Sequence, residues 1–170
     1  MDGTLAAVYY LLALIDMGMN HCPNDGCLAR NEVQDRYWLQ AGQVEFQREV
    51  IGEEIVIGWD LDRARGPFQR SLVASVTDQG SFWIGFGNKT QWNLGGGWFF
   101  EGSAMPGLYA KGDGEDLGGV LQFRSSLGFG YEFNNGATMS LQYDHRSNAD
   151  LNDYNPGLET LSIRYAFVID

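Results

Sequence analysis

Three side chains near the C-terminus have the residue types needed for nucleophilic acyl transfer. His145 and Ser147 are two residues apart, so in a β-strand they lie on the same face. Glu159 begins the next apolar stretch. If the two stretches form a hairpin centred on Asn152, residues pair when their numbers add up to 304, which places Glu159 opposite His145. Directly opposed β-carbons are about 4.5–5.5 Å apart, so the carboxylate could orient the imidazole.

Each of these groups has a defined role in that chemistry. Ser147 would attack an acyl carbon, His145 would take and return the proton, and Glu159 would fix the imidazole tautomer. Asn148 follows the serine, and its side-chain amide or its backbone N–H could donate to the oxyanion. A second interpretation stays open, in which the histidine and serine merely mark the point where a strand leaves a membrane.

The elements that must position these residues are β-strands. From about residue 35 onward apolar and polar residues alternate, most clearly from Val120 to Phe133, and Asn134-Asn135-Gly136 then predicts a tight turn. Many of the stretches approach the 9–11 residues or so that a tilted strand needs to cross a bilayer. The expected strands cover residues 36–47, 54–62, 68–77, 82–90, 97–105, 120–133, 137–147 and 157–168.

The two faces of these strands differ in a way that indicates a membrane barrel. One face carries many large apolar side chains, and the other carries Arg124, Arg146 and Arg164 together with acids, amides and glycines. Large apolar side chains outside and a salt-bridged interior are typical of a small outer-membrane barrel. We therefore predict an all-β protein, an eight-stranded antiparallel up-and-down outer-membrane β-barrel. A soluble, lipocalin-like barrel would show the same periodicity and is the alternative.

Composition excludes two other classes of protein. The 170 residues carry a formal net charge of −11, which argues against a nucleic-acid binder. The chain is 44% hydrophobic and 14% aromatic, which argues against disorder. Its 23 glycines are about twice the usual share and fit a twisted all-β chain.

The N-terminal part is distinct from the barrel. Leu5 to Ile15 is an unbroken apolar run that is too short to span a bilayer. No Lys or Arg precedes it and no small-x-small cleavage site is evident before Cys22, so a cleaved export signal and a retained helix both stay open. We expect residues 1–30 to form this segment with a cysteine loop, and residues 31–170 to form the barrel.

Cys22 and Cys27 flank a segment rich in turn-forming residues. A small disulfide loop is the favoured interpretation, and it implies an oxidising compartment. The alternatives are two free thiols or a metal site with His21, which lacks further ligands nearby. We expect no metal and no cofactor.

The C-terminal motifs resemble a known family. Residues 145–148 are His-Arg-Ser-Asn, residues 155–159 are Asn-Pro-Gly-Leu-Glu, and residues 121–131 are Leu-Gln-Phe-Arg-Ser-Ser-Leu-Gly-Phe-Gly-Tyr. This pattern closely resembles the signature of the lipid A 3-O-deacylase (PagL) family, also described as acyloxyacyl hydrolases. The resemblance covers about residues 120–167.

The resemblance implies an integral protein of the bacterial outer membrane that hydrolyses the ester-linked acyl chain at position 3 of lipid A. Carried over by motif, Ser147 is the nucleophile, His145 the base and Glu159 the orienting acid. Asn148 and Asn155 become supporting residues around the oxyanion. The implied partner is lipid A or lipopolysaccharide of the outer leaflet, bound by a monomer or homodimer without nucleic acid.

One departure and two alternative functions accompany this resemblance. Family members often have glycine near position 150, where this chain has Asp150, which bears on the backbone part of the oxyanion hole. The chain could instead be a structural or adhesive barrel without enzymatic activity, or a barrel esterase that acts on another lipid such as a phospholipid. With both termini periplasmic, Ser147 would lie near the outer leaflet.

Overall fold

The computed structural model describes residues 3–24 and 26–168, most of which lie in strands. The α-helix α1 (Thr4–Asp16) and the π-helix η1 (Met17–His21) come first. A strand of three residues, β1 (Arg30–Glu32), precedes eight longer ones. These are β2 (Arg36–Phe46), β3 (Glu49–Arg65), β4 (Phe68–Thr77), β5 (Phe82–Gly95), β6 (Trp98–Ala110), β7 (Leu121–Glu132), β8 (Thr138–Ser147) and β9 (Leu158–Val168).

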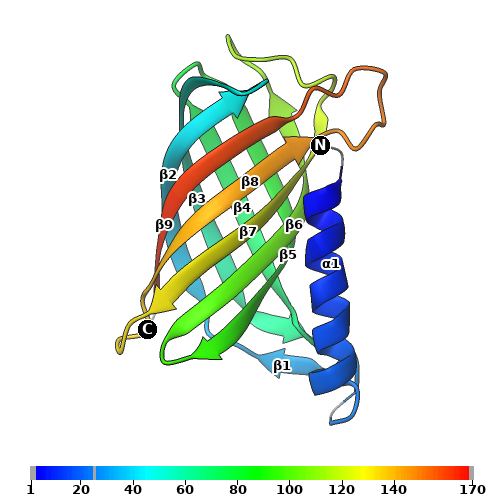
Figure 1. Cartoon of the computed structure of the whole chain (residues 1–170), viewed down its shortest axis with the longest axis vertical. Coiled ribbons are helices and arrows are strands. Elements are labelled where there is room, and N and C mark those ends of the chain that lie inside the picture. The colour runs from blue at the N-terminus through cyan, green and yellow to red at the C-terminus, as the bar shows by residue number, and fades with distance from the viewer. Residues whose placement is uncertain (1–2, 25, 169–170) are drawn as a thin grey trace.

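Strands β2 to β9 form a closed antiparallel barrel (Figure 1). Each pairs with the next along the chain, and β9 pairs with β2 to complete the ring. The short β1 adds to the end of β3, where Arg30 lies opposite Arg65. The prediction of an eight-stranded up-and-down barrel is therefore confirmed, with β1 as an addition that the sequence did not indicate.

The two ends of the barrel differ in their connections. Short connections join the strands at the end where β2 begins, which we call the turn end. The opposite end, the loop end, carries the two longest connections between barrel strands, residues 111–120 and 148–157. Short turns on one side and longer loops on the other are typical of outer-membrane barrels, whose loops face outward from the cell.

Side chains alternate between the lumen and the outer wall. On the outer wall Leu141, Leu161 and Ile163 are apolar and yet 48–59% exposed. In the lumen Gln40 and Gln142 are polar and fully buried. A soluble barrel would have the reverse arrangement, so the lumen-facing polar set agrees with the membrane form of the fold.

Charged side chains inside the lumen pair with one another. Lys89 lies 2.7 Å from Asp60 and 2.8 Å from Glu101. A second buried cluster consists of Glu54, Arg124, Asp144 and Arg146. Buried charges are tolerated only when they are paired and hydrogen-bonded, so these contacts hold strands from opposite sides of the barrel together.

Aromatic side chains gather on the outer wall near the turn end. The rings of Tyr37 and Trp59 lie 5.6 Å apart, and those of Trp98 and Phe129 stack at 5.3 Å. An aromatic girdle of this kind marks the membrane–water interface of outer-membrane barrels. The girdle therefore fixes one boundary of the hydrocarbon zone.

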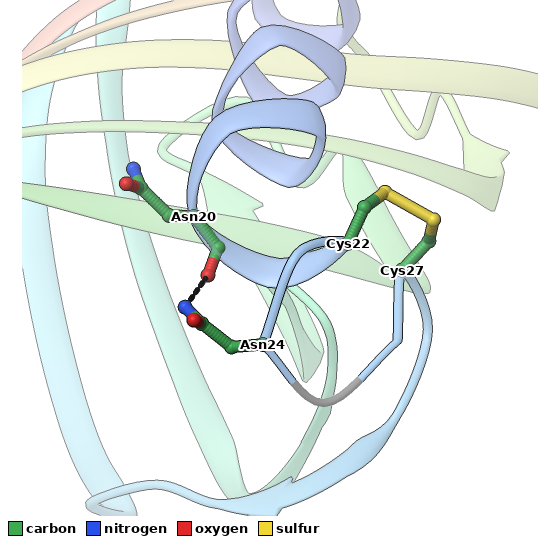
Figure 2. Close-up of a disulfide and its surroundings, with 4 residues drawn as sticks. All are labelled: Asn20, Cys22, Asn24 and Cys27. Carbon is green, nitrogen blue, oxygen red and sulfur yellow. Dashed lines mark hydrogen bonds between the residues drawn. A yellow bond between two sulfur atoms is a disulfide. The ribbon is translucent and has the colours of Figure 1, made fainter.

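The N-terminal segment is helical and ends in a disulfide. Cys22 and Cys27 are bonded to each other, and the side-chain amide of Asn24 donates to the backbone oxygen of Asn20 in the enclosed turn (Figure 2). Beyond the disulfide, the N–H of Gly66 at the turn end donates to the chain leading into β1. Among residues 3–24 and 26–168, no helix is long and apolar enough to cross a membrane.

Candidate active site

His145 and Ser147 lie at the loop end of β8, on its outer face. The strand ends at Ser147 because the chain turns directly after it, with the N–H of Leu151 donating to the oxygen of Asn148 at 3.2 Å. The apolar residues Leu141 and Met139 share this face. Alternation thus places the two polar side chains at the upper edge of the apolar wall.

Glu159 faces His145 from the neighbouring strand. The two residues are direct partners in the register of β8 and β9, as the hairpin arithmetic predicted. Nδ1 of His145 lies 3.2 Å from Oε1 of Glu159, within hydrogen-bond reach. With Nδ1 donating to the carboxylate, the imidazole is held in the tautomer in which Nε2 is the basic nitrogen.

These polar groups are shielded although they lie on the outer face. Ser147 and His145 are each 4% exposed, and the side chain of Glu159 is 20% exposed. The apolar neighbours on the same wall are roughly half exposed. Removal from water and lipid strengthens the electrostatic coupling between the carboxylate and the imidazole.

Asn148 has a different surrounding from the one that we expected. Its backbone N–H donates to Oδ1 of Asn155 at 3.0 Å. Its side-chain amide is fully buried and donates to the backbone oxygens of Leu117, Gly118 and Tyr154. Both groups that we expected to serve the oxyanion are thus engaged within the protein, and this side chain instead joins the two long loops.

The two residues after Asn148 have an unusual backbone conformation. Ala149 and Asp150 have φ values of 54° and 57°, in the left-handed region that favours glycine. Nδ2 of Asn155 donates to Oδ1 of Asp150 at 2.8 Å and holds the turn. Within the described residues neither N–H of this pair donates a hydrogen bond, so both can serve a ligand.

Sequence reasoning missed a neighbour of His145 and a neighbour of Glu159. Ser125 on β7 is its partner on the other side, and Glu45 on β2 is the partner of Glu159. One row across the outer wall therefore contains Glu45, Glu159, His145 and Ser125. The signal was available, because the β7–β8 turn at Asn134-Asn135-Gly136 sets the register that pairs Ser125 with His145.

Within the described residues, no cluster of three or more His, Cys, Asp and Glu side chains is arranged to hold a metal ion. Arg146, which alternation assigns to the lumen, lies inside the barrel against Glu54.

The profile of one protein family, described as lipid A 3-O-deacylase (PagL), matches residues 44–168. The chain belongs to the lipid A 3-O-deacylase (PagL) family. The match includes β8, β9 and the loop between them, while α1, η1 and the disulfide lie before it. Together with the barrel, membership in the PagL family identifies an integral protein of the outer membrane.

Solved structures agree with this fold. The crystal structure of the outer membrane enzyme PagL is similar with a TM-score of 0.67 at 22% identity, covering 79% of this chain and 99% of that chain. The crystal structure of Neisserial surface protein A is similar with a TM-score of 0.59 at 10% identity, covering 83% and 99%. No curated protein sequence matches this PagL-family chain significantly.

Proposed function

We propose that this protein is an outer-membrane esterase that hydrolyses the ester-linked acyl chain at position 3 of lipid A. Ser147 is the nucleophile, His145 the general base and Glu159 the residue that orients the base. The observation that carries the proposal is the 3.2 Å contact between His145 and Glu159. His145 lies two residues before Ser147, on the same lipid-facing wall. Family membership supports lipid A as the substrate.

The reaction begins with proton transfer from Ser147 to Nε2 of His145. The serine oxygen attacks the ester carbonyl, and the imidazolium that forms is stabilised by the carboxylate of Glu159. The proton then passes to the departing sugar oxygen, which leaves an acyl-enzyme. Water, deprotonated by His145, releases the fatty acid and restores the serine.

The oxyanion needs donors that the protein has not already used. The backbone N–H groups of Ala149 and Asp150 meet this condition among the described residues, whereas those of Asn148 do not. We assign the oxyanion to these two backbone groups. Asn148 and Asn155 then support it indirectly by holding the turn in the left-handed conformation.

The height of the site fits a substrate in the outer leaflet. Ser147 is at the loop end, opposite the aromatic girdle of the turn end. Lipid A carries its ester bonds close to its polar head, so a nucleophile at the upper edge of the apolar wall meets the bond without leaving the membrane. The loop end faces outward in barrels of this type.

Ser147→Ala tests this function. Cells that express the wild-type chain should contain lipid A lacking one acyl chain by mass spectrometry, and cells that express the variant should contain unmodified lipid A. Ser125→Ala is the matched comparison, since Ser125 flanks His145 from β7, and it should keep measurable hydrolysis. Equal lipid A masses in wild-type and Ser147→Ala cells would contradict the proposal.

The same pair of variants addresses the alternatives. A barrel without enzymatic activity would leave lipid A unchanged in every strain. A phospholipid esterase would release fatty acids from phospholipid vesicles and not from lipopolysaccharide, with the same dependence on Ser147. Heat-modifiable migration of each variant in gel electrophoresis would show that the barrel has formed.

A further inference from the structure

Helix α1 lies along the outer wall of the barrel (Figure 1). It packs against β6 and β7. Tyr9 and Ala13 are the buried residues of the helix, both fully covered, and they form a cluster with Ala104 of β6. Helix α1 therefore occupies a surface that would otherwise face lipid.

The wall under α1 is shaped for this contact. A Cβ atom at Gly102 would lie 2.7 Å from the ring of Tyr9, so the missing side chain leaves the space that the ring fills. The Tyr9 hydroxyl lies 3.3 Å from Oγ1 of Thr90, which donates to the backbone oxygen of Pro67. Small residues and a hydrogen bond are what hold helices together in membranes, where apolar area alone gives little attraction.

The free side of α1 is apolar. From Thr4 to Ile15 the helix carries no charged residue. Its exposed large side chains are Val8, Tyr10, Leu11, Leu12, Leu14 and Ile15. Such a surface is costly in water and suits hydrocarbon. The disulfide after η1 limits the freedom of the chain that follows, close to the turn end.

α1 contacts the barrel on the row of paired residues that contains His145. Ala104, which the helix covers, is the register partner of Ser125, and Ser125 is the partner of His145. The row across the outer wall thus continues from the catalytic histidine to the helix over two neighbouring strands. α1 stands beside the site on its β7 side.

Exposure on the two sides of β8 differs accordingly. On the β7 side Ser125 is 4% exposed although it points outward. On either side of Tyr143, Leu127 of β7 is partly buried whereas Leu161 of β9 is 48% exposed. Further towards the turn end both sides are open, because Phe129 of β7 is 49% and Ile163 of β9 59% exposed on either side of Leu141, itself 56% exposed. A long acyl chain needs a continuous open apolar surface below the serine, and the wall of β8 and β9 supplies it.

We propose that α1 is a permanent, lipid-embedded part of the wall that covers β6 and β7 and closes the β7 side next to Ser147, so that the scissile acyl chain lies over β8 and β9. The position of α1 stands on its contacts alone, and the path of the acyl chain rests on the proposed function. α1 is then part of the folded protein rather than an export signal that is removed. Its presence makes the wall of β9 the surface that selects acyl-chain length.

Disulfide cross-linking of the full-length chain in outer membranes tests the first half. Ala13→Cys combined with Ala104→Cys should give a cross-linked peptide pair, because the two side chains belong to the same buried cluster. Leu14→Cys with Ala104→Cys is the control, since Leu14 is 50% exposed on another side of the helix, and should give little product. Absence of the first cross-link, or mature protein whose mass lacks residues 4–16, would overturn the position of α1.

Acyl-chain selectivity tests the second half. Leu161→Trp should lower kcat/KM for a lipid A with a long 3-acyl chain relative to a short one by about tenfold, roughly the effect of losing one apolar contact surface. Val8→Trp, on the exposed side of α1, should leave the ratio of the two kcat/KM values as in the wild type. If Val8→Trp changed this ratio and Leu161→Trp did not, the proposed path of the acyl chain over β9 would be wrong. A wild-type chain that cleaves neither substrate would overturn the proposed function, and the cross-link would still decide the position of α1.

Discussion

A Cβ atom at position 157 would lie 2.9 Å from Cε1 of His145. Gly157 precedes β9 and has a φ of 75°, a conformation that L residues with side chains rarely adopt. The backbone of the loop therefore packs directly on the imidazole and, together with Glu159, the direct partner of His145 on β9, holds the ring in one orientation.

Gly157→Ala should consequently reduce hydrolysis while the barrel still forms. The added methyl group pushes the imidazole out of line with Ser147, and a displacement of about 1 Å can lower kcat by roughly 10²-fold. Mass spectrometry of lipid A at successive times gives the rate of hydrolysis, and heat-modifiable migration in gel electrophoresis shows whether the barrel has folded. Gly80→Ala is the control, because Gly80 also has a positive φ of 77° but has no neighbour within 4 Å of an added Cβ. Equal losses in both variants would refute the role of Gly157.

Glu159→Gln should reduce kcat by about 10²- to 10⁴-fold, the range of catalytic effects attributed to a base and its orienting acid. The amide no longer stabilises the imidazolium and can select the wrong tautomer. Glu45→Gln is a matched control, since Glu45 is the partner of Glu159 on β2 and carries the same charge on the same wall. If both variants lost activity equally, a general effect of negative charge would replace the specific role of Glu159.

The sequence predicted the register of the site because hairpins obey simple arithmetic. Once the β8–β9 loop was centred on Asn152, the pairing of His145 with Glu159 followed, and the structure has that pairing. Alternation also placed Arg146 in the lumen, where it contacts Glu54. The same rule assigns Asn148 to the lumen side, opposite to Ser147, so its expected contact with the oxyanion through the side chain conflicts with its own position in the sequence.

Other features had no readable signal. The β2–β3 turn uses Gln47 and Arg48 with φ values of 51° and 73°, without the glycine or asparagine that normally marks such turns. The predicted second strand therefore began at residue 54, whereas β3 begins at Glu49. The packing of α1 on the barrel depends on the space that Gly102 leaves for the ring of Tyr9, and this space arises only once the strands are paired.

Asn148→Ala should destabilise the loop end. The change removes the amide that donates to the backbone oxygens of Leu117, Gly118 and Tyr154, of which Leu117 keeps a second donor in Gln122. We expect a loss of about 2 kcal/mol in the free energy of unfolding. Urea unfolding in detergent micelles measures it, and limited proteolysis should cut the loop of residues 148–157 faster. Asn134→Ala, in an exposed turn, should change neither quantity appreciably. Unchanged stability in Asn148→Ala would show that the two loops are held by other contacts.

Lys89→Met should destabilise the barrel by about 3–5 kcal/mol, because removing the ammonium takes away the cation that pairs with buried Asp60, while Glu101 keeps its contact with Arg164. The expected size of the loss distinguishes the lumen network from surface ion pairs, which contribute about 0–1 kcal/mol. Lys111→Met, at an exposed loop position, serves as the control and should leave the unfolding midpoint in place. A stability of Lys89→Met equal to that of the wild type would mean that water or the remaining cations compensate both acids.

Ala149→Gly should stabilise the turn after Ser147 by about 1 kcal/mol, because glycine adopts a φ of 54° without the strain that a Cβ atom causes. Ala149→Val should have the opposite effect, since a β-branched residue fits this conformation worst. Ala41→Gly on β2 provides the comparison, as the same exchange within a strand should lower stability by about 0.5–1 kcal/mol. The unfolding free energies of the three variants in one detergent check the order. If Ala149→Gly and Ala41→Gly both destabilised the barrel, the turn would not store the strain that its backbone angles indicate. The backbone N–H groups assigned to the oxyanion would then lack the rigid position that this assignment requires.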